Sequence, residues 1–239
     1  MKIKFQSCFP RLSTFLHGYT ASTDNATQSA LQFLNDHVSE RAEEIYTDTV
    51  KMFPDKAKDY MISPGQGRFI NWLVEMSNSE RILELGSFTG YSAACMLSGY
   101  AGVDCRKDVT CVEKIKEYAT MLKANVPEAN VVNVDALDYL LSFTSDQEQQ
   151  FDFVFVDAGK KRYDAIHDLL IKKEIVMKGG MIVYDNVFLR DRVFEDVTLY
   201  NEGKQRGMAE KMRAFLENVL KDRRAVLVPA FDGILIFNV

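Results

Sequence analysis

The sequence has few cysteines, no excess of basic residues and no long hydrophobic run, and each absence excludes a class of protein. Its 4 cysteines in 239 residues show no C-x-x-C spacing and are too few for a disulfide framework, which favours a reducing compartment. The net charge of -5 argues against nucleic acid as a partner, because a nucleic-acid surface needs a basic face. No apolar run reaches the ~18 residues of a membrane span. We therefore expect a cytoplasmic protein with no membrane partner.

The apolar content is high enough for one domain with a buried core. Hydrophobic residues make up 47% of the chain, and the sequence has no internal repeat or low-complexity segment. A helix start signal at Asp24 and Asn25, followed by apolar residues at helical spacing, predicts one or two helices over residues 27–53. We divide the single domain into an N-terminal helical extension, residues 1–60, and an α/β core, residues 61–239.

Proline and glycine mark the boundaries of the next segments. Pro54 is expected to end the first helical region, because proline lacks the amide hydrogen that a helix interior needs. The segment 61–68, MISPGQGR, is predicted to be a loop. A helix is predicted over residues 69–76, with Trp72, the only tryptophan, in the core.

Residues 82–92, ILELGSFTGYS, are predicted to form a buried strand, a glycine turn and the start of a helix. Glu84 lies inside this strand, where a carboxylate needs a cationic or hydrogen-bonding partner. A dinucleotide-binding turn would need glycine at the position of Phe88, and no P-loop sequence follows, so a bound phosphate is disfavoured. The pattern favours a nucleoside cofactor with positive charge, of which S-adenosylmethionine is the commonest. An ordinary strand, turn and helix without a ligand stays open as the alternative.

Acidic residues also follow the next two predicted strands. Glu113 follows the strand predicted over residues 109–112, and Asp135 follows the strand predicted over residues 130–134. A carboxylate at the position of Glu113 can accept hydrogen bonds from both hydroxyl groups of a ribose. The alternative is a glutamate at a helix N-terminus that the helix dipole stabilises, and both interpretations stay open.

Oxygen-bearing side chains end two further predicted strands, residues 151–157 and 179–186. The helix between these strands makes a βαβ unit, so both strands run in parallel and their carboxyl ends converge. Asp157, Asp185 and Asn186 would then offer three oxygen ligands to a hard divalent cation, with magnesium, calcium and manganese all open. The alternative is that each aspartate only caps the turn after its own strand.

Four ordered stretches of the sequence resemble the cation-dependent O-methyltransferases of the caffeoyl-CoA and catechol type. They are MISPGQGRF, ELGSFTGYS, FVFVDAGKKRY and GGMIVYDNV. The resemblance implies an α/β class I methyltransferase (Rossmann-like) fold. Its central sheet has seven mostly parallel strands with helices on both faces. Its predicted C-terminal antiparallel hairpin has strands at residues 225–229 and 233–237. The resemblance also implies a homodimer.

The resemblance assigns roles to individual residues. Asp157, Asp185 and Asn186 would bind the divalent cation, with magnesium as the first choice. Lys160 would be the general base. The predicted S-adenosylmethionine-binding residues lie along the same mouth of the sheet: Ser63, Glu84, Gly86, Tyr91, Ser92, Glu113, Asp135, Ala136 and Asp157. A lysine beside a divalent cation and a sulfonium has its ammonium form disfavoured, which fits a base. The alternative for Lys160 is a solvated charge in the run Lys160–Arg162.

The chain departs from the family pattern beside the cation and acceptor positions. Gly159 stands where the family has aspartate, and Arg162 stands where it has asparagine. The segment 188–191 replaces the L-W-x-G that often follows the D-N-V motif. Arg190 and Arg192 could meet an anionic acceptor or be solvated. The acceptor therefore does not carry over from the family.

The predicted function is S-adenosylmethionine-dependent and divalent-cation-dependent O-methyl transfer to one hydroxyl of a catechol-like small molecule. One alternative is another hydroxyl acceptor, such as a natural product or a hydroxycinnamoyl thioester. A second is a cofactor-binding scaffold without turnover, although Lys160 and the three cation residues are all present. An NAD oxidoreductase is disfavoured by Phe88.

Overall fold

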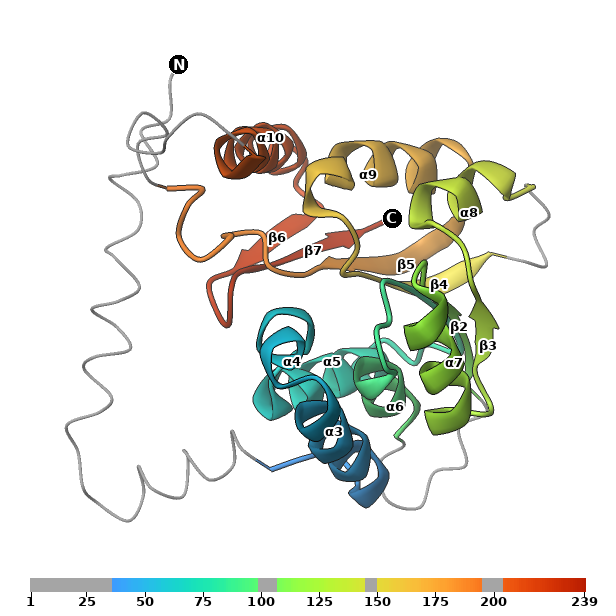
Figure 1. Cartoon of the computed structure of the whole chain (residues 1–239). Coiled ribbons are helices and arrows are strands. Elements are labelled where there is room, and N and C mark those ends of the chain that lie inside the picture. Colours follow the sequence, from blue (N-terminus) through green and yellow to red (C-terminus); the bar gives the residue numbers. More distant parts are fainter. Residues whose placement is uncertain (1–35, 99–106, 145–149, 195–203) are drawn as a thin grey trace, which may run out of the picture.

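A seven-stranded sheet with helices on both faces forms the protein (Figure 1). The computed structural model describes residues 36–98, 107–144, 150–194 and 204–239. The strands are β1 (Arg81–Leu85), β2 (Asp108–Val112), β3 (Asn130–Val132), β4 (Phe151–Val156), β5 (Val176–Tyr184), β6 (Ala225–Val228) and β7 (Ile234–Asn238). The helices are α3 (Glu40–Met52), α4 (Pro54–Tyr60), α5 (Pro64–Met76), α6 (Tyr91–Leu97), α7 (Lys116–Asn125), α8 (Ala136–Ser142), α9 (Tyr163–Lys172) and α10 (Lys204–Val219), with a short 3-10 helix η3 (Lys160–Arg162).

The strand order is β3-β2-β1-β4-β5-β7-β6. Strands β1 to β5 are parallel, whereas β7 is antiparallel to both of its neighbours, β5 and β6. The chain leaves β1 toward β2 on one side and later returns to β4 on the other. The carboxyl ends of these strands are therefore the place where ligands bind in open α/β sheets. The predicted fold class is confirmed, and β4 and β5 are neighbours as expected.

Two hydrophobic clusters fill the space between the sheet and its two helical layers. Helices α8, α9 and α10 cover one face, and helices α3, α5, α6 and α7 cover the other (Figure 1). Strand β1 is mostly apolar because both of its faces are covered. Leu83 packs in the first cluster and Ile82 packs in the second. The alternation of a strand puts Glu84 on the α6 side of the sheet.

The two proline positions compare differently with the sequence-based expectation. Helix α3 ends at Met52, before Pro54, as expected, and Pro54 also begins α4. Pro64 begins α5, because a proline at the first helical position loses no hydrogen bond. The predicted loop over residues 61–68 is therefore wrong from Pro64 onward. Ser63 caps α5 by accepting a hydrogen bond from the Gln66 amide at 3.2 Å. Trp72 is also not in the core, since 48% of its surface is exposed.

Parts of the predicted N-terminal region lie outside the described residues. The helix start signal at Asp24 and Asn25 is among these parts, whereas α3 falls inside the predicted helical range. The division at residue 60 stays a prediction. Within the described ranges, no helix is long and apolar enough to cross a membrane.

Candidate active site

The glycine turn after β1 lies directly against the end of β4. Gly86 has a φ of +93°, and a Cβ atom at this position would lie 2.5 Å from the Asp157 carbonyl oxygen. The Asp157 amide in turn donates to the Leu85 carbonyl at 2.9 Å. Only glycine fits this close approach of two backbones. The turn is thereby fixed next to the first of the predicted cation residues.

Glu84 is completely buried beneath this turn. The Ser92 hydroxyl donates to one of its carboxylate oxygens, and Cys111 Sγ lies 3.6 Å from the other. Burial raises the pKa of Glu84 to about 7, although the Ser92 hydrogen bond opposes the shift. Hydrogen-bonding groups therefore meet the carboxylate, as the sequence required.

Glu113, at the end of β2, connects that strand to the glycine turn. Its carboxylate accepts the Phe88 amide at 3.0 Å and the Ile115 amide at 2.8 Å. Burial raises the pKa of Glu113, and these two hydrogen bonds oppose the shift. The Phe88 ring packs against Tyr118 with ring centroids 4.6 Å apart, so a packed aromatic side chain stands at the position where a dinucleotide-binding turn needs glycine.

The same turn contains an unsatisfied polar atom. Ser87 Oγ is buried and makes no hydrogen bond of good geometry within the described residues, although its hydroxyl lies close enough to Glu84 to lower the pKa of that carboxyl. A buried hydroxyl without a good hydrogen bond is costly, so it indicates a missing polar group. A ligand with polar groups, such as a nucleoside, fits this turn.

Asp157, Asp185 and Asn186 come together at the carboxyl ends of β4 and β5, as predicted. The residues that precede the two aspartates, Val156 and Tyr184, are paired in the sheet. Asp185 is only 1% exposed. Burial raises the pKa of Asp185 to about 7, and the negative charge of Asp157 adds to the shift.

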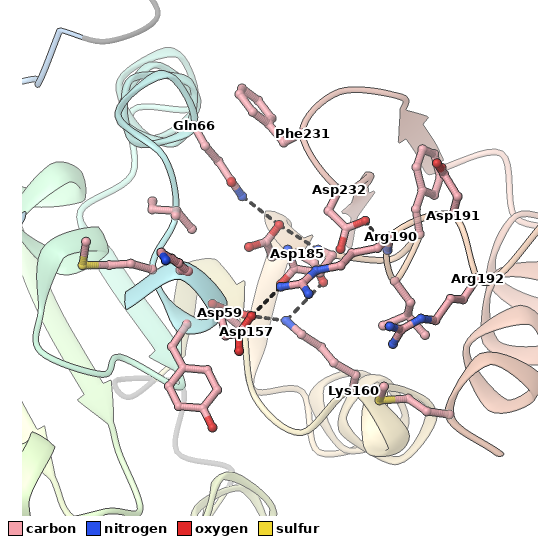
Figure 2. Close-up of a pocket in the computed structure, with 18 residues that line it drawn as sticks. Asp59, Gln66, Asp157, Lys160, Asp185, Arg190, Asp191, Arg192, Phe231 and Asp232 are labelled. Carbon is pink, nitrogen blue, oxygen red and sulfur yellow. Dashed lines mark hydrogen bonds and ion pairs between the residues drawn. The ribbon is translucent and has the colours of Figure 1, made fainter. Parts of the chain in front are cut away.

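Lys160 lies at the centre of this group (Figure 2). Its ammonium forms an ion pair with the Asp157 carboxylate, accompanied by contacts of 3.0 Å to the Tyr163 hydroxyl and 3.5 Å to the Asp185 carbonyl. Burial alone would lower the pKa of Lys160, but the charges of Asp157 and Asp185 outweigh it and raise the pKa. In this state Lys160 is a proton donor and the counter-ion of Asp157.

The donor set fits a hard cation in chemistry and in charge. The candidate site offers two carboxylates, those of Asp157 and Asp185, and the side-chain amide of Asn186. No group of three or more His, Cys, Asp or Glu side chains that could hold a metal occurs in the described residues. One ammonium balances only one of the two carboxylates, that of the partly exposed Asp157 and that of the buried Asp185. Oxygen ligands with excess negative charge are what magnesium, calcium and manganese prefer.

A cavity of about 780 Å³ opens above these residues. Figure 2 shows charged side chains from several elements around it. Arg190 forms an ion pair with Asp59 of α4, at 2.5 Å, and both residues line the cavity. Among the described residues, Arg192 has no ion-pair partner. The space is large enough for a drug-sized ligand.

The remaining predicted cofactor residues are not all at the turn. Ala136 begins α8 and is buried, and Asp135 caps that helix. Ser63 caps α5 and is exposed. The Tyr91 ring points away, into the cluster under α3, where its hydroxyl lies 2.9 Å from His37 Nδ1. Only the Tyr91 backbone adjoins the turn, so its role in binding stays a prediction.

Sequence reasoning missed several partners of the predicted residues. Gln66 donates to the Asp185 carboxylate at 2.7 Å, and Cys111 contacts Glu84. The Tyr163 hydroxyl lies 2.9 Å from the Asp185 carbonyl. Gln66 lies in the MISPGQGRF stretch that resembles the family, so the same resemblance that indicates Ser63 could have indicated Gln66.

Comparisons with known proteins identify the family. The O-methyltransferase family profile matches residues 35–238. A probable caffeoyl-CoA O-methyltransferase 3 of Dictyostelium discoideum is 26% identical over 87% of this chain and 88% of its own length. A caffeoyl-CoA O-methyltransferase of Populus kitakamiensis is 35% identical over 55% of this chain and 57% of its own.

Two solved structures share the fold. The SAH-bound methyltransferase of Podospora anserina superposes with a TM-score of 0.73 at 22% identity, covering 90% of this chain and 95% of that one. The Bacillus cereus O-methyltransferase in complex with SAH gives a TM-score of 0.68 at 24% identity, covering 84% and 91%. The predicted enzyme class is confirmed, and the chain belongs to the O-methyltransferase family, whose members use S-adenosylmethionine.

Proposed function

We propose that this enzyme transfers a methyl group from S-adenosylmethionine to one hydroxyl of a catechol-like acceptor, and that the reaction requires a divalent cation. One observation carries the proposal. Asp157, Lys160, Asp185 and Asn186 all line one cavity beside the glycine turn. An acceptor in this cavity would therefore meet a cation-binding group and a proton-accepting group together.

The names of the relatives support an aromatic acceptor with adjacent hydroxyl groups. The Dictyostelium and Populus relatives are named for caffeoyl-CoA, whose aromatic ring carries two neighbouring hydroxyls. The cavity of about 780 Å³ exceeds what a single ring fills, and this favours a hydroxycinnamoyl thioester as the second candidate acceptor.

The proposed cofactor residues surround the glycine turn. Glu113 would accept hydrogen bonds from the ribose, since each of its carboxylate oxygens retains acceptor capacity beyond one backbone amide. Glu84 and Ser92 would face the cationic part of S-adenosylmethionine, which favours the ionised carboxylate. Ser87 Oγ would gain a hydrogen bond of good geometry. The cofactor supplies the methyl group on a sulfonium.

The cation would be held by Asp157, Asp185 and Asn186, with magnesium as the first choice and calcium or manganese as alternatives. When bound, it supplies positive charge that lowers the pKa of an acceptor hydroxyl and neutralises the carboxylates. Lys160 would then lose the charge that raises its pKa, and its Nζ atom could accept the proton of the hydroxyl. Gln66 and Tyr163 would hold Asp185 and Lys160 in place. The predicted homodimer and cytoplasmic location stay predictions.

The test is a panel of methyl acceptors assayed with labelled S-adenosylmethionine. The panel contains catechols, matched monohydroxy compounds and hydroxycinnamoyl thioesters, each with magnesium or with excess chelator. We expect turnover only for acceptors with adjacent hydroxyls, abolished by chelator and restored by magnesium. Full activity in excess chelator, or equal rates with monohydroxy acceptors, would refute the proposal.

A further inference from the structure

Arg162 forms a bidentate ion pair with Asp135. Arg162 Nη1 donates to Asp135 Oδ1 at 2.8 Å, and Nη2 donates to Oδ2 at 2.7 Å. The Arg162 hydrogen bond lowers the pKa of Asp135, and the same contact raises the pKa of Arg162. Paired guanidinium and carboxylate groups in this fork geometry fix both distance and orientation.

The ion pair joins two loops whose strands are not neighbours. Asp135 follows β3 and caps α8 by accepting the Leu137 amide at 3.0 Å. Arg162 ends η3, which follows β4. Strands β1 and β2 lie between β3 and β4 in the sheet. The pair therefore connects the loop after β3, which belongs to the proposed nucleoside-binding site, to the segment after β4 that carries Lys160.

Gly159 makes room for this arrangement. A Cβ atom at residue 159 would lie 3.3 Å from Arg162 Nε and 3.4 Å from Nη2. A side chain at this position would therefore press on the guanidinium, and an aspartate would also compete for it. The two departures from the family motif, Gly159 for aspartate and Arg162 for asparagine, therefore lie next to each other in the structure, and the Arg162 amide donates to the Gly159 carbonyl at 2.9 Å.

We infer that Arg162 is a positioning residue for S-adenosylmethionine, which acts by holding Asp135 and the start of α8 in the conformation that receives the nucleoside. The inference rests on the proposed function. A binding loop that is already ordered before the cofactor arrives loses less conformational freedom when the cofactor binds. Loss of the ion pair then weakens cofactor binding and leaves the chemical step intact.

The experiment measures the dissociation constant of S-adenosylhomocysteine by calorimetry, in chelator, for the wild type and a set of variants. Arg162→Asn should raise the dissociation constant about tenfold, and Arg162→Lys should raise it less, because lysine keeps the charge without the fork. Arg162→Asn should have no further effect in an Asp135→Asn background. With saturating cofactor, turnover should stay within about twofold.

A matched control uses another bidentate pair. Arg224 binds the Asp222 carboxylate through Nε and Nη2, at the start of β6. Arg224→Asn should leave the dissociation constant unchanged. Gly159→Asp should also raise the dissociation constant, because its side chain would press on the Arg162 guanidinium and compete with Asp135 for it.

The outcomes separate the two proposals. If the wild type does not bind S-adenosylhomocysteine, the proposed function fails. If the wild type binds but Arg162→Asn leaves the dissociation constant unchanged or lowers it, the positioning role is refuted. Additive effects of Arg162→Asn and Asp135→Asn would also refute it, because they would show that Arg162 does not act through Asp135.

Discussion

The buried carboxylate of Glu84 couples the stability of the enzyme to pH. Its pKa is about 7 in the folded protein, against 4.5 in an ordinary glutamate, because the side chain is completely buried. The folded state therefore binds a proton more tightly than the unfolded state. Ionisation of Glu84 therefore lowers the free energy of unfolding. This loss is absent below the pKa of Glu84 in the unfolded chain and complete above pH 7, where it amounts to about 3 kcal/mol.

Glu84→Gln should remove this pH-dependent penalty. The free energy of unfolding of the variant, relative to that of the ligand-free wild type, should rise between pH 5 and pH 8. Urea unfolding at several pH values measures the difference. Glu117→Gln, at an exposed position, is the control for the substitution itself. A difference that does not change with pH would contradict the burial of an ionising Glu84.

Substitutions of Lys160 distinguish a general base from a side chain that only supplies positive charge. If Lys160 accepts the proton, Lys160→Ala should lower the methyl-transfer rate about a hundredfold, as is typical of a lost general base. Lys160→Arg should be almost as slow, because a guanidinium keeps the charge but stays protonated near neutral pH. Single-turnover assays with saturating cofactor measure the rate.

The pH dependence and the cofactor affinity complete this test. The loss of rate in Lys160→Ala should shrink as pH rises, since the acceptor hydroxyl then ionises without help. The dissociation constant of S-adenosylhomocysteine should stay within about twofold of the wild-type value. A Lys160→Arg variant that keeps most of its rate at neutral pH would leave only an electrostatic role for the side chain.

The location of a single residue in the fold was predictable from sequence where its position at the end of a strand determined that location. Asp157, Asp185 and Asn186 follow two neighbouring parallel strands, so the topology alone brings them together. Gln66 could not be placed in this way, because its contact with Asp185 spans 119 residues and depends on the direction of α5. The Arg162 to Asp135 contact likewise depends on side-chain conformation.

At the scale of elements, the backbone of the turn after β1 lies so close to the end of β4 that the residue at position 86 is restricted. Gly86→Ala places a Cβ atom 2.5 Å from the Asp157 carbonyl oxygen at a φ of +93°. Gly179→Ala is a matched control, because Gly179 has a φ of +85° but no atom within 4 Å of its Cβ position. The comparison separates the cost of backbone conformation from the cost of the contact.

Gly179→Ala should destabilise the protein by about 1 to 2 kcal/mol, the cost of a left-handed conformation for alanine. Gly86→Ala should cost clearly more and also weaken binding of S-adenosylhomocysteine, because the turn must move away from β4. Thermal unfolding and calorimetry measure the two effects. Equal destabilisation by both variants would show that the turn can move without cost.

Element types were predictable from sequence, but element boundaries depended on local chemistry. Residues 82–85 form a strand as predicted, because an apolar run of that length suits a sheet buried on both faces. Pro64 was misinterpreted as part of a loop, because a proline is also suited to the first position of a helix. Trp72 lies on α5 but on its exposed side.

The order of the whole sheet was accessible only through the family resemblance. Periodicity predicts strands and helices, but it does not decide which strand lies beside β1. The βαβ unit between β4 and β5 was the exception, because its handedness and short connection make the two strands neighbours. The resemblance supplied the antiparallel β7, which the structure confirms.

At the scale of the molecule, binding of the proposed cofactor should stabilise the fold. A ligand that binds only the folded state at 100 times its dissociation constant adds about 2.7 kcal/mol to the free energy of unfolding. S-adenosylhomocysteine should produce this shift, whereas NAD at the same concentration should produce none, because Phe88 stands where a dinucleotide-binding turn needs glycine. Urea unfolding with each ligand measures both shifts. Equal stabilisation by NAD would contradict the assignment of the glycine turn to a nucleoside without a pyrophosphate.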